Sequence, residues 1–417
     1  MKVEILAIGT EVVQGDVVNS NASWLSTQMI DKGFEVQFHS AVPDEENLML
    51  DAMARAASRA QIVLVTGGLG PTVDDFTLEV AAKFFGRKLV QHAESLERLK
   101  TFFKAFNRTM TPNQEKQAML PEGCTVLKNE VGTAPGVYYL YQNTHFGFFP
   151  GVPSEMKKMF SEAFWPLLEP YSTGQIKRYR RTLRCFGLPE GQLDHLVKGS
   201  RKQQAEFLGV ELGFRVRFPE IDIRLQTSAL KAQEAEDKLD EASDAILREV
   251  GEHIFGQDEA NLNRVVADLL SEKSMSLAVA ESCTGGLLAS TITDVPGASE
   301  YFIEGLVTYS NEAKMDLLEV KSETLEKYGA VSREVALEMA HGVRKRAEAT
   351  IGIGVTGIAG PTGGSQEKPV GSVHIAMVYP EGEWEGRYLF PWGRERFKQV
   401  VVATALDRIR RFLLAMT

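Results

Sequence analysis

A serine stands where the apolar run Ser276 to Ala280 gives way to a glycine-rich turn, Glu281 to Gly286. The run predicts a strand, and Gly285 to Ile292 predict the start of a helix. A serine on such a turn points to solvent, and the backbone N–H groups after it lie unsatisfied at the positive end of the helix dipole. This geometry offers a nucleophile and an oxyanion site together. In the alternative interpretation, Ser282 or Thr284 only caps the helix.

The serine hydroxyl needs a base, and none of the seven histidines lies in a motif near it. The segment Val307 to Lys314 supplies a lysine instead, because burial can lower the pKa of a lysine from about 10.4 toward ~7–8. Ser-Lys pairs are a known variant of the catalytic triad, and Tyr309 is placed to relay the proton or to orient Lys314. Cys283 is a rival nucleophile, although no histidine or basic run stands near it to lower its pKa.

A second glycine-rich segment, Thr356 to Ser365, follows the apolar run Ile351 to Val355. Such a loop brings backbone N–H groups close to an anion, but it is neither a Walker loop nor a dinucleotide fingerprint. We predict phosphate or ribose binding here; the alternative is a long surface loop. Arg394, before the last helix, is a candidate phosphate clamp. The predicted binding residues of this part of the chain are Thr284, Gly285, Gly286, Gly357, Ala359, Gly360, Gly363, Gly364 and Arg394.

The N-terminal part of the chain carries its own glycine turns and carboxylates. A glycine turn at a strand end can cradle a phosphate, and adjacent carboxylates can hold Mg²⁺. The alternative is a capped helix start, in which Asp74 or Asp75 stabilises a first turn. Asp74 and Asp75 are the candidate metal ligands. The predicted site as a whole comprises Glu11, Asn19, Asn21, Gly67, Gly68, Gly70, Thr72, Asp74 and Asp75.

The elements that must position the N-terminal residues alternate between β-type runs and amphipathic helices. A βαβαβ order predicts a parallel sheet with helices on both faces, and ligands bind beyond the carboxyl ends of such strands. The glycine turns after Ile8 and Thr66 lie at those ends. The predicted strands are Val3 to Ile8, Phe34 to Val42 and Ile62 to Thr66; the predicted helices are Asn21 to Lys32 and Glu46 to Arg59.

After residue 170 the pattern changes to a small α+β unit. It holds a basic stretch, Lys177 to Arg181 followed by Arg184, which we interpret as a solvated basic strand edge; a polyanion contact is the alternative. The unit lacks a Gly-x-x-Gly loop between helices, which argues against RNA binding. Its predicted elements are a strand at Arg181 to Phe186, a helix at Glu190 to Lys198, a hairpin at Phe214 to Thr227 with Pro219 near its turn, and a helix at Ala229 to Val250.

The last part of the chain returns to an α/β pattern. We therefore predict two α/β three-layer domains with parallel-rich sheets, joined by a small α+β domain, with boundaries at 1–170, 171–257 and 258–417. The predicted helices of the last part, besides the one at Gly285, are Leu262 to Glu272, Ala330 to Ala347 and Phe397 to Leu414; the predicted strands are Ser276 to Ala280, Ile351 to Val355 and Val370 to Val378.

Composition narrows the class of protein. The 417 residues are 44% hydrophobic and 24% charged, as in ordinary globular proteins. A net charge of −10 argues against a general nucleic-acid partner. No apolar run reaches the roughly 18 residues of a membrane span, and the N-terminus predicts a strand rather than a signal peptide. Three scattered cysteines predict neither a disulfide framework nor a zinc site, so we expect a cytoplasmic protein.

Four motifs occur in order: Ala280 to Gly286, Thr308 to Lys314, Gly329 to Ser332, and Gly354 to Gly364 followed by Lys368-Pro369-Val370-Gly371. Together they resemble the nicotinamide-mononucleotide deamidase domain of the CinA (competence/damage-inducible protein A) family. The resemblance implies a Ser282 nucleophile completed by Tyr309 and Lys314, hydrolysis to nicotinate mononucleotide and ammonia, and no cofactor for this reaction. The chain departs from the family pattern at Trp392-Gly393-Arg394 and at Lys398, where a second arginine is common.

The N-terminal motifs, with Gly132 to Gly136 and Pro150 to Glu155, are similar to the molybdopterin-binding-like domain of the same family. In some members this domain is a metal-dependent ADP-ribose pyrophosphatase, and in others the activity is lost. The middle segment resembles the family's KH-type domain. The resemblance implies nucleotide substrates, a divalent metal such as Mg²⁺ at the N-terminal site, and a homodimer in which domain swapping is open. The competing hypothesis is a non-catalytic, molybdopterin-type binding module or a competence-linked scaffold.

Overall fold

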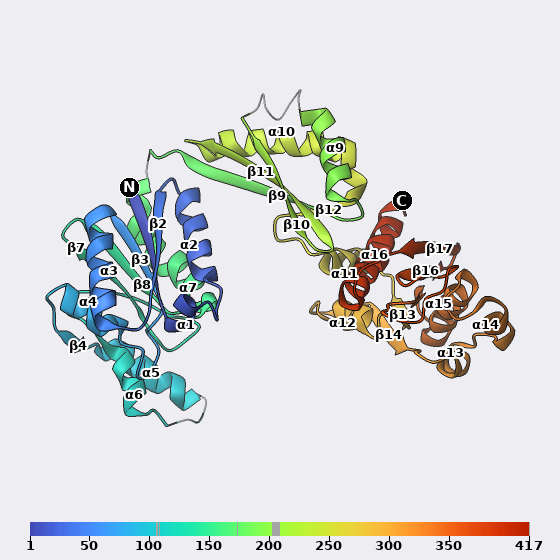
Figure 1. Cartoon of the computed structure of the whole chain (residues 1–417), viewed down its shortest axis with the longest axis horizontal. Coiled ribbons are helices and arrows are strands. Elements are labelled where there is room, and N and C mark those ends of the chain that lie inside the picture. The colour runs from blue at the N-terminus through green and yellow to red at the C-terminus, as the bar shows by residue number, and fades with distance from the viewer. Residues whose placement is uncertain (106, 108, 173, 202–208, 417) are drawn as a thin grey trace. The chain divides into compact units, whose positions relative to one another are not determined.

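The computed structural model describes all residues except 106, 108, 173, 202–208 and 417. Its contacts divide into two compact units, one of Met1–Tyr179 with Ser228–Glu234 and one of Arg180–Thr227 with Ala235–Thr417 (Figure 1). Besides a two-stranded pair, three larger sheets belong to three successive stretches of chain. The mixed α/β architecture predicted from the sequence is confirmed. Across the described part of the chain, no helix combines the length and the apolar character needed to cross a membrane.

The N-terminal sheet has the strand order β2-β1-β3-β8-β7-β6. Its first four strands run parallel, so their carboxyl ends meet at one edge, whereas the last two are antiparallel additions. The strands are β1 (Lys2–Ile8), β2 (Glu35–Val42), β3 (Ile62–Thr66), β6 (Thr125–Leu127), β7 (Gly136–Tyr141) and β8 (Thr144–Phe149), and β4 (Leu89–Gln91) pairs separately with β5 (Met119–Pro121).

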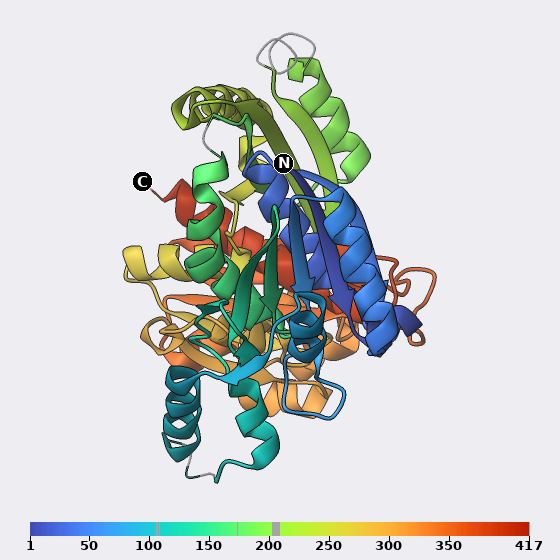
Figure 2. The ribbon, with the colours of Figure 1, turned by 90° about the vertical axis from the view of Figure 1, so that its left-hand side faces the viewer.

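Helices cover both faces of this sheet, as Figures 1 and 2 show. Side chains of a strand alternate between faces, so Val3 and Ile5 pack with one helix layer while Val63 and Val65 pack with the other. The first layer contains α2 (Ser20–Asp31) and α7 (Pro153–Met159), and the second α3 (Glu46–Arg59) and α4 (Thr77–Phe84). The remaining helices of this part are α1 (Thr10–Gln14), α5 (Ala93–Ala105), α6 (Pro112–Glu115) and α8 (Trp165–Leu168).

The middle segment forms a four-stranded sheet in the order β10-β11-β9-β12. The basic stretch lies on β9, which is an interior strand, so the predicted solvated edge is wrong. Arg184 is only 4% exposed and pairs with the buried Asp222, while Arg181 pairs with Glu236 and Asp240. The elements are β9 (Lys177–Cys185), α9 (Glu190–Arg201), β10 (Glu211–Arg217), β11 (Glu220–Ala229), α10 (Ala232–Val250) and β12 (Ile254–Gln257).

The C-terminal sheet has the order β14-β13-β15-β16-β17, with β14, β13 and β15 parallel and the last two strands antiparallel. One face packs against α11 and α16, the other against α13 and α15. The strands are β13 (Leu277–Glu281), β14 (Phe302–Val307), β15 (Ile351–Gly357), β16 (Ser372–Tyr379) and β17 (Gly382–Leu389), and the helices are α11 (Leu262–Glu272), α12 (Leu287–Thr293), α13 (Asn311–Leu318), α14 (Ser322–Tyr328), α15 (Arg333–Ala347) and α16 (Arg394–Ala415).

The predicted start of the helix after Ser282 is two residues too early. Gly285 and Gly286 have φ of 60° and 91°, a left-handed conformation that continues the turn and delays α12 to Leu287. Both glycines therefore belong to the turn that presents the serine.

Candidate active sites at two sheet edges

Three parallel strands of the C-terminal sheet deliver the predicted catalytic residues to one edge. Ser282 follows β13, the Thr308 to Lys314 segment follows β14, and the glycine-rich segment begins with the last two residues of β15, Thr356 and Gly357, and continues beyond it. The Ser282 N–H donates to the Val355 carbonyl at 2.9 Å, which ties the serine turn to the neighbouring strand. Because carboxyl ends of parallel strands share one edge, residues distant in sequence become neighbours here.

The predicted base and nucleophile lie within hydrogen-bond reach of each other. Lys314 Nζ lies 3.3 Å from Ser282 Oγ, and it donates to the Thr308 carbonyl at 2.8 Å and to the Tyr309 carbonyl at 3.3 Å. The Ser310 hydroxyl caps α13 through the Ala313 N–H, which turns these loop carbonyls toward the lysine. Lys314 is only 1% exposed, and burial lowers its pKa. A buried amine in this position can accept the proton of a serine hydroxyl.

The rival nucleophile, Cys283, is poorly suited to act as a nucleophile. Its side chain is buried, and burial raises the pKa of the thiol to about 12. A thiol in that state carries almost no thiolate at neutral pH, and the thiolate is the reactive form. Of the two neighbouring side chains, Ser282 is therefore the better nucleophile.

The helix N-terminus after Ser282 is not left open as predicted. The buried Glu281 carboxylate accepts from the N–H groups of Gly286, Leu288 and Ala289 at 2.8–3.1 Å, so these donors are already used and neither Ser282 nor Thr284 caps the helix. The N–H group of Gly286, a predicted substrate-binding residue, is thus engaged by Glu281. The hydrogen bonds of the described residues include none from the N–H groups of Cys283 and Thr284. These two N–H groups are therefore the candidate oxyanion donors.

Arg394 joins the serine edge to the glycine-rich loop. Its guanidinium donates to the Gly360 carbonyl at 3.2 Å and to the Tyr309 hydroxyl at 3.0 Å, and Tyr309 is 61% exposed. Tyr309 therefore orients Lys314 through its carbonyl while its hydroxyl faces the arginine. Lys398 adds a second cation, since a β-carbon on Gly285 would lie 3.7 Å from Lys398 Nζ. Of the predicted loop residues, Ala359 and Gly360 are buried, Gly357 is half-buried, and Gly363 and Gly364 are exposed.

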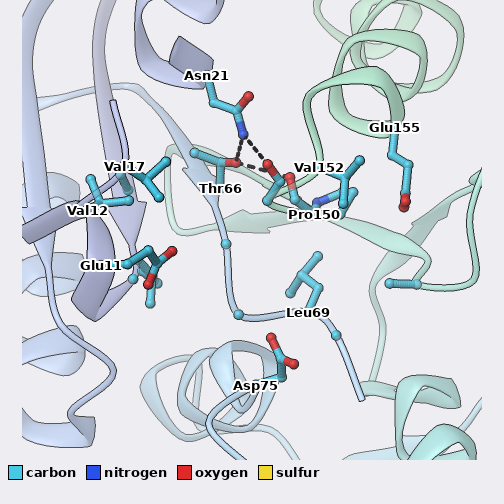
Figure 3. Close-up of a pocket in the computed structure, with 18 of the residues that line it drawn as sticks. Glu11, Val12, Val17, Asn21, Thr66, Leu69, Asp75, Pro150, Val152 and Glu155 are labelled. Atoms are coloured by element: carbon cyan, nitrogen blue, oxygen red, sulfur yellow. Dashed lines mark hydrogen bonds between the residues drawn. The ribbon is translucent and has the colours of Figure 1, made fainter. Parts of the chain in front are cut away.

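The N-terminal site is a cavity of about 580 Å³ at the carboxyl ends of the parallel strands (Figure 3). Gly67 permits the close turn there, because a β-carbon on it would lie 2.0 Å from the Ile8 carbonyl oxygen. Thr72 lies outside the lining and binds Asp75 through its N–H at 2.9 Å. The predicted residues that do line the cavity are Glu11, Asn19, Asn21, Gly67, Gly68, Gly70, Asp74 and Asp75.

Further polar residues of this cavity were missed by sequence reasoning, among them Asp44, Gln117 and Glu155. Asp44 lies two residues beyond β2, so the strand-end argument applied to that strand would have found it; its carboxylate accepts from the Thr10 N–H at 2.8 Å. Glu155 lies within a motif that carried the family resemblance, and Asn129 donates to its carboxylate at 2.6 Å. Gln117 comes from a short helix with no such signal.

The cavity is rich in acceptors. Five carboxylates line it, none of its described lining residues is Lys, Arg or His, and the side-chain oxygens of Asn21 and Gln117 are buried with no partner. Figure 3 shows the Asn21 amide nitrogen joined to Thr66. The same nitrogen donates to the Gly151 carbonyl at 2.8 Å, which leaves the amide oxygen without a partner. No three of the described His, Cys, Asp or Glu side chains are grouped closely enough to hold a metal ion by themselves.

Comparison with known proteins gives matches along the whole chain. Residues 259–413 match the family described as "CinA C-terminal domain", residues 4–170 "Probable molybdopterin binding domain", and residues 180–256 "Damage-inducible protein CinA KH domain". The chain is similar to a CinA-like protein of Desulforapulum autotrophicum, with 42% identity over 420 residues and 99% of both chains covered. A CinA-like protein of Geotalea uraniireducens is 40% identical over 420 residues, covering 100% of this chain and 98% of its own. The crystal structure of competence/damage inducible protein CihA from Agrobacterium tumefaciens is 44% identical, covers 35% of this chain and 90% of its own, and has a TM-score of 0.34.

Proposed function

The chain belongs to the CinA family over its full length, and from this premise we propose that its C-terminal domain hydrolyses nicotinamide mononucleotide to nicotinate mononucleotide and ammonia. The observation that carries the proposal is the 3.3 Å distance between the buried Lys314 Nζ and the Ser282 hydroxyl. Three free cysteines support a reducing, cytoplasmic setting for this chemistry. The homodimer implied by the family resemblance stays a prediction.

The reaction follows from these groups in two halves. Ser282 Oγ attacks the carboxamide carbon while its proton passes to neutral Lys314, and the N–H groups of Cys283 and Thr284 receive the developing oxyanion. The C–N bond then breaks, Lys314 returns its proton to the leaving nitrogen, and ammonia departs. Lys314 next takes a proton from water, whose oxygen attacks the ester carbon. Ser282 leaves with that proton, and the product is the carboxylic acid, which loses its own proton to solvent and becomes the carboxylate.

We propose that Arg394 and Lys398 hold the substrate phosphate beside the serine turn. Replacing Arg394 by Ala should raise KM about 10- to 100-fold and leave kcat within about threefold, because a charge-assisted hydrogen bond contributes about 1.5–3 kcal/mol to ground state and transition state alike. Steady-state ammonia release measures this effect. Arg264→Ala removes an exposed arginine on α11 and serves as the control. Equal KM values for the two variants would contradict the assignment of Arg394.

For the N-terminal domain we propose a metal-dependent ADP-ribose pyrophosphatase. A cavity with five carboxylates repels a bare pyrophosphate, so this ligand needs divalent cations to enter. Mg²⁺ typically binds one or two carboxylates together with substrate phosphates and waters, which fits Asp74 and Asp75 without a preformed cluster of three acidic groups. The metal would polarise the phosphate and offset its charge.

In this domain, Asp75→Asn should lower Mg²⁺-dependent AMP release from ADP-ribose about 100-fold, and EDTA should abolish the release in the wild type. Asp51→Asn, in an exposed pair with Arg55 on α3, should leave it unchanged. AMP release is followed by chromatography. If the wild type releases no AMP but retains a pterin ligand tightly, the domain is instead a molybdopterin-type binding module.

A further inference from the structure

The helix that carries the proposed phosphate-binding cations is attached to the middle domain at both of its ends. Arg394 is the first residue of α16, and Lys398 lies one turn later beside Gly285. The geometry of this helix relative to Ser282 therefore sets where the substrate phosphate can lie. Any element that fixes α16 acts on substrate position without contacting the substrate.

The C-terminal half of α16 is bound by the segment that ends the middle domain. Arg410, which is buried, donates to the carbonyls of Glu252 at 2.6 Å and Ile254 at 3.4 Å. Arg411 contacts the Glu252 carboxylate at 2.7 Å and His253 Nδ1 at 3.0 Å. The Asp407 carboxylate accepts from both guanidinium groups at 2.7–2.9 Å and so orients both arginines toward residues 252–254.

The N-terminal end of α16 is met by the hairpin of β10 and β11, labelled in Figure 1. The ring of Phe218, at the hairpin turn, lies edge-on to Trp392 with centroids 5.3 Å apart, and the Arg396 guanidinium lies 5.2 Å from the Phe218 ring. Trp392 in turn stacks on Phe390 at 5.7 Å. Phe218 also packs against the hydrophobic core of the C-terminal domain. Trp392 stands two residues before Arg394.

We propose that the middle domain is a positioning element of the amidase site and that Phe218 is its contact residue, holding Trp392 and thereby the Arg394 end of α16. The proposal rests on the proposed amidase function. Aromatic pairs and cation–π contacts of this kind each stabilise a local arrangement. The hairpin contacts the segment Phe390 to Gly393 through the pair of Phe218 and Trp392. Phe218 touches neither Ser282 nor Lys314, so its removal should weaken substrate binding and spare the chemical step.

The test compares Phe218→Ala with Val216→Ala, which removes an exposed side chain from the same hairpin. Phe218→Ala should raise KM for nicotinamide mononucleotide about tenfold with kcat within about twofold, and should speed amide hydrogen exchange over residues 390–396 at least about tenfold. Val216→Ala should change neither quantity. Phe218→Tyr, which keeps the ring, should behave like the wild type. Trp392→Ala should have the same effect as Phe218→Ala, and the double variant should show no larger effect than either single one.

Two results would overturn the inference. One is hydrogen exchange over 390–396 that is the same in Phe218→Ala and Val216→Ala; the other is a KM of Phe218→Ala that is unchanged from the wild type. If the wild-type chain releases no ammonia, the proposed amidase function fails instead, and the exchange comparison alone still decides whether Phe218 positions the Trp392 to Arg396 segment. A Phe218→Ala chain that loses its cooperative melt is replaced by Trp392→Ala, which is judged by the same two readouts.

Discussion

Replacing Lys314 by Met should lower kcat for ammonia release about 10³-fold or more and abolish the acid limb of the pH–rate profile. Methionine keeps the bulk of the side chain but cannot accept the Ser282 proton, so the hydroxyl loses the base that lies 3.3 Å from it in the wild type. In the wild type, burial lowers the Lys314 pKa below its usual value of 10.5, and the neutral amine is the reactive form. The rate should therefore rise with pH through a pKa lower than 10.5.

The same substitution, which should lower the activity, should not lower the stability of the fold. Because the pKa of Lys314 is lower in the folded than in the unfolded chain, the unfolded state binds more protons between the two values, and stability rises with pH through that window. Lys314→Met removes this rise and removes a buried charge, so its melting temperature should not fall below the wild-type value at neutral pH. Lys345→Met, at an exposed surface pair, is the control. An active Lys314→Met enzyme with an unaltered acid limb would refute the lysine base.

Ser282→Ala should lower ammonia release to at least the same extent, about 10³-fold or more, because alanine has no hydroxyl to place beside Lys314 Nζ. Cys283 cannot rescue the reaction, since burial raises the pKa of its thiol to about 12. Ammonia is measured by a coupled assay in a chain whose melting temperature is checked first. Ser290→Ala, which alters an exposed serine of α12, is the matched control. Residual activity of Ser282→Ala close to that of Ser290→Ala would require another nucleophile.

Much of the framework follows from local patterns. Ile62 to Val65 are all apolar and, with Thr66, become a strand buried on both faces, and Glu46 to Arg59 forms the predicted helix to the residue. The position of Ser282 beside Lys314 follows from one further rule, that parallel strands end at a common edge. The strand that precedes Thr308, β14 (Phe302–Val307), was not among the predicted strands, so the sequence paired Ser282 with Lys314 only through the need for a base and the family resemblance.

The departures arise where a long-range partner decides the outcome. Glu281 was predicted to be only the first residue of the glycine-rich turn, yet its buried carboxylate caps α12 and takes N–H donors that had been assigned to the oxyanion. Arg184 reads as a surface cation but is neutralised inside the sheet by Asp222, 38 residues away. The contact of Phe218 with Trp392 spans two domains, and no periodicity within either segment predicts it.

The most direct test of the central claim is ammonia release from nicotinamide mononucleotide by the full-length chain in the presence of hydroxylamine. An acyl-Ser282 intermediate transfers its acyl group to hydroxylamine as well as to water, so the account predicts a hydroxamate of the mononucleotide beside nicotinate mononucleotide, formed only with enzyme present. Ammonia released with no hydroxamate would indicate direct attack by water, and no ammonia at all would remove the amidase assignment.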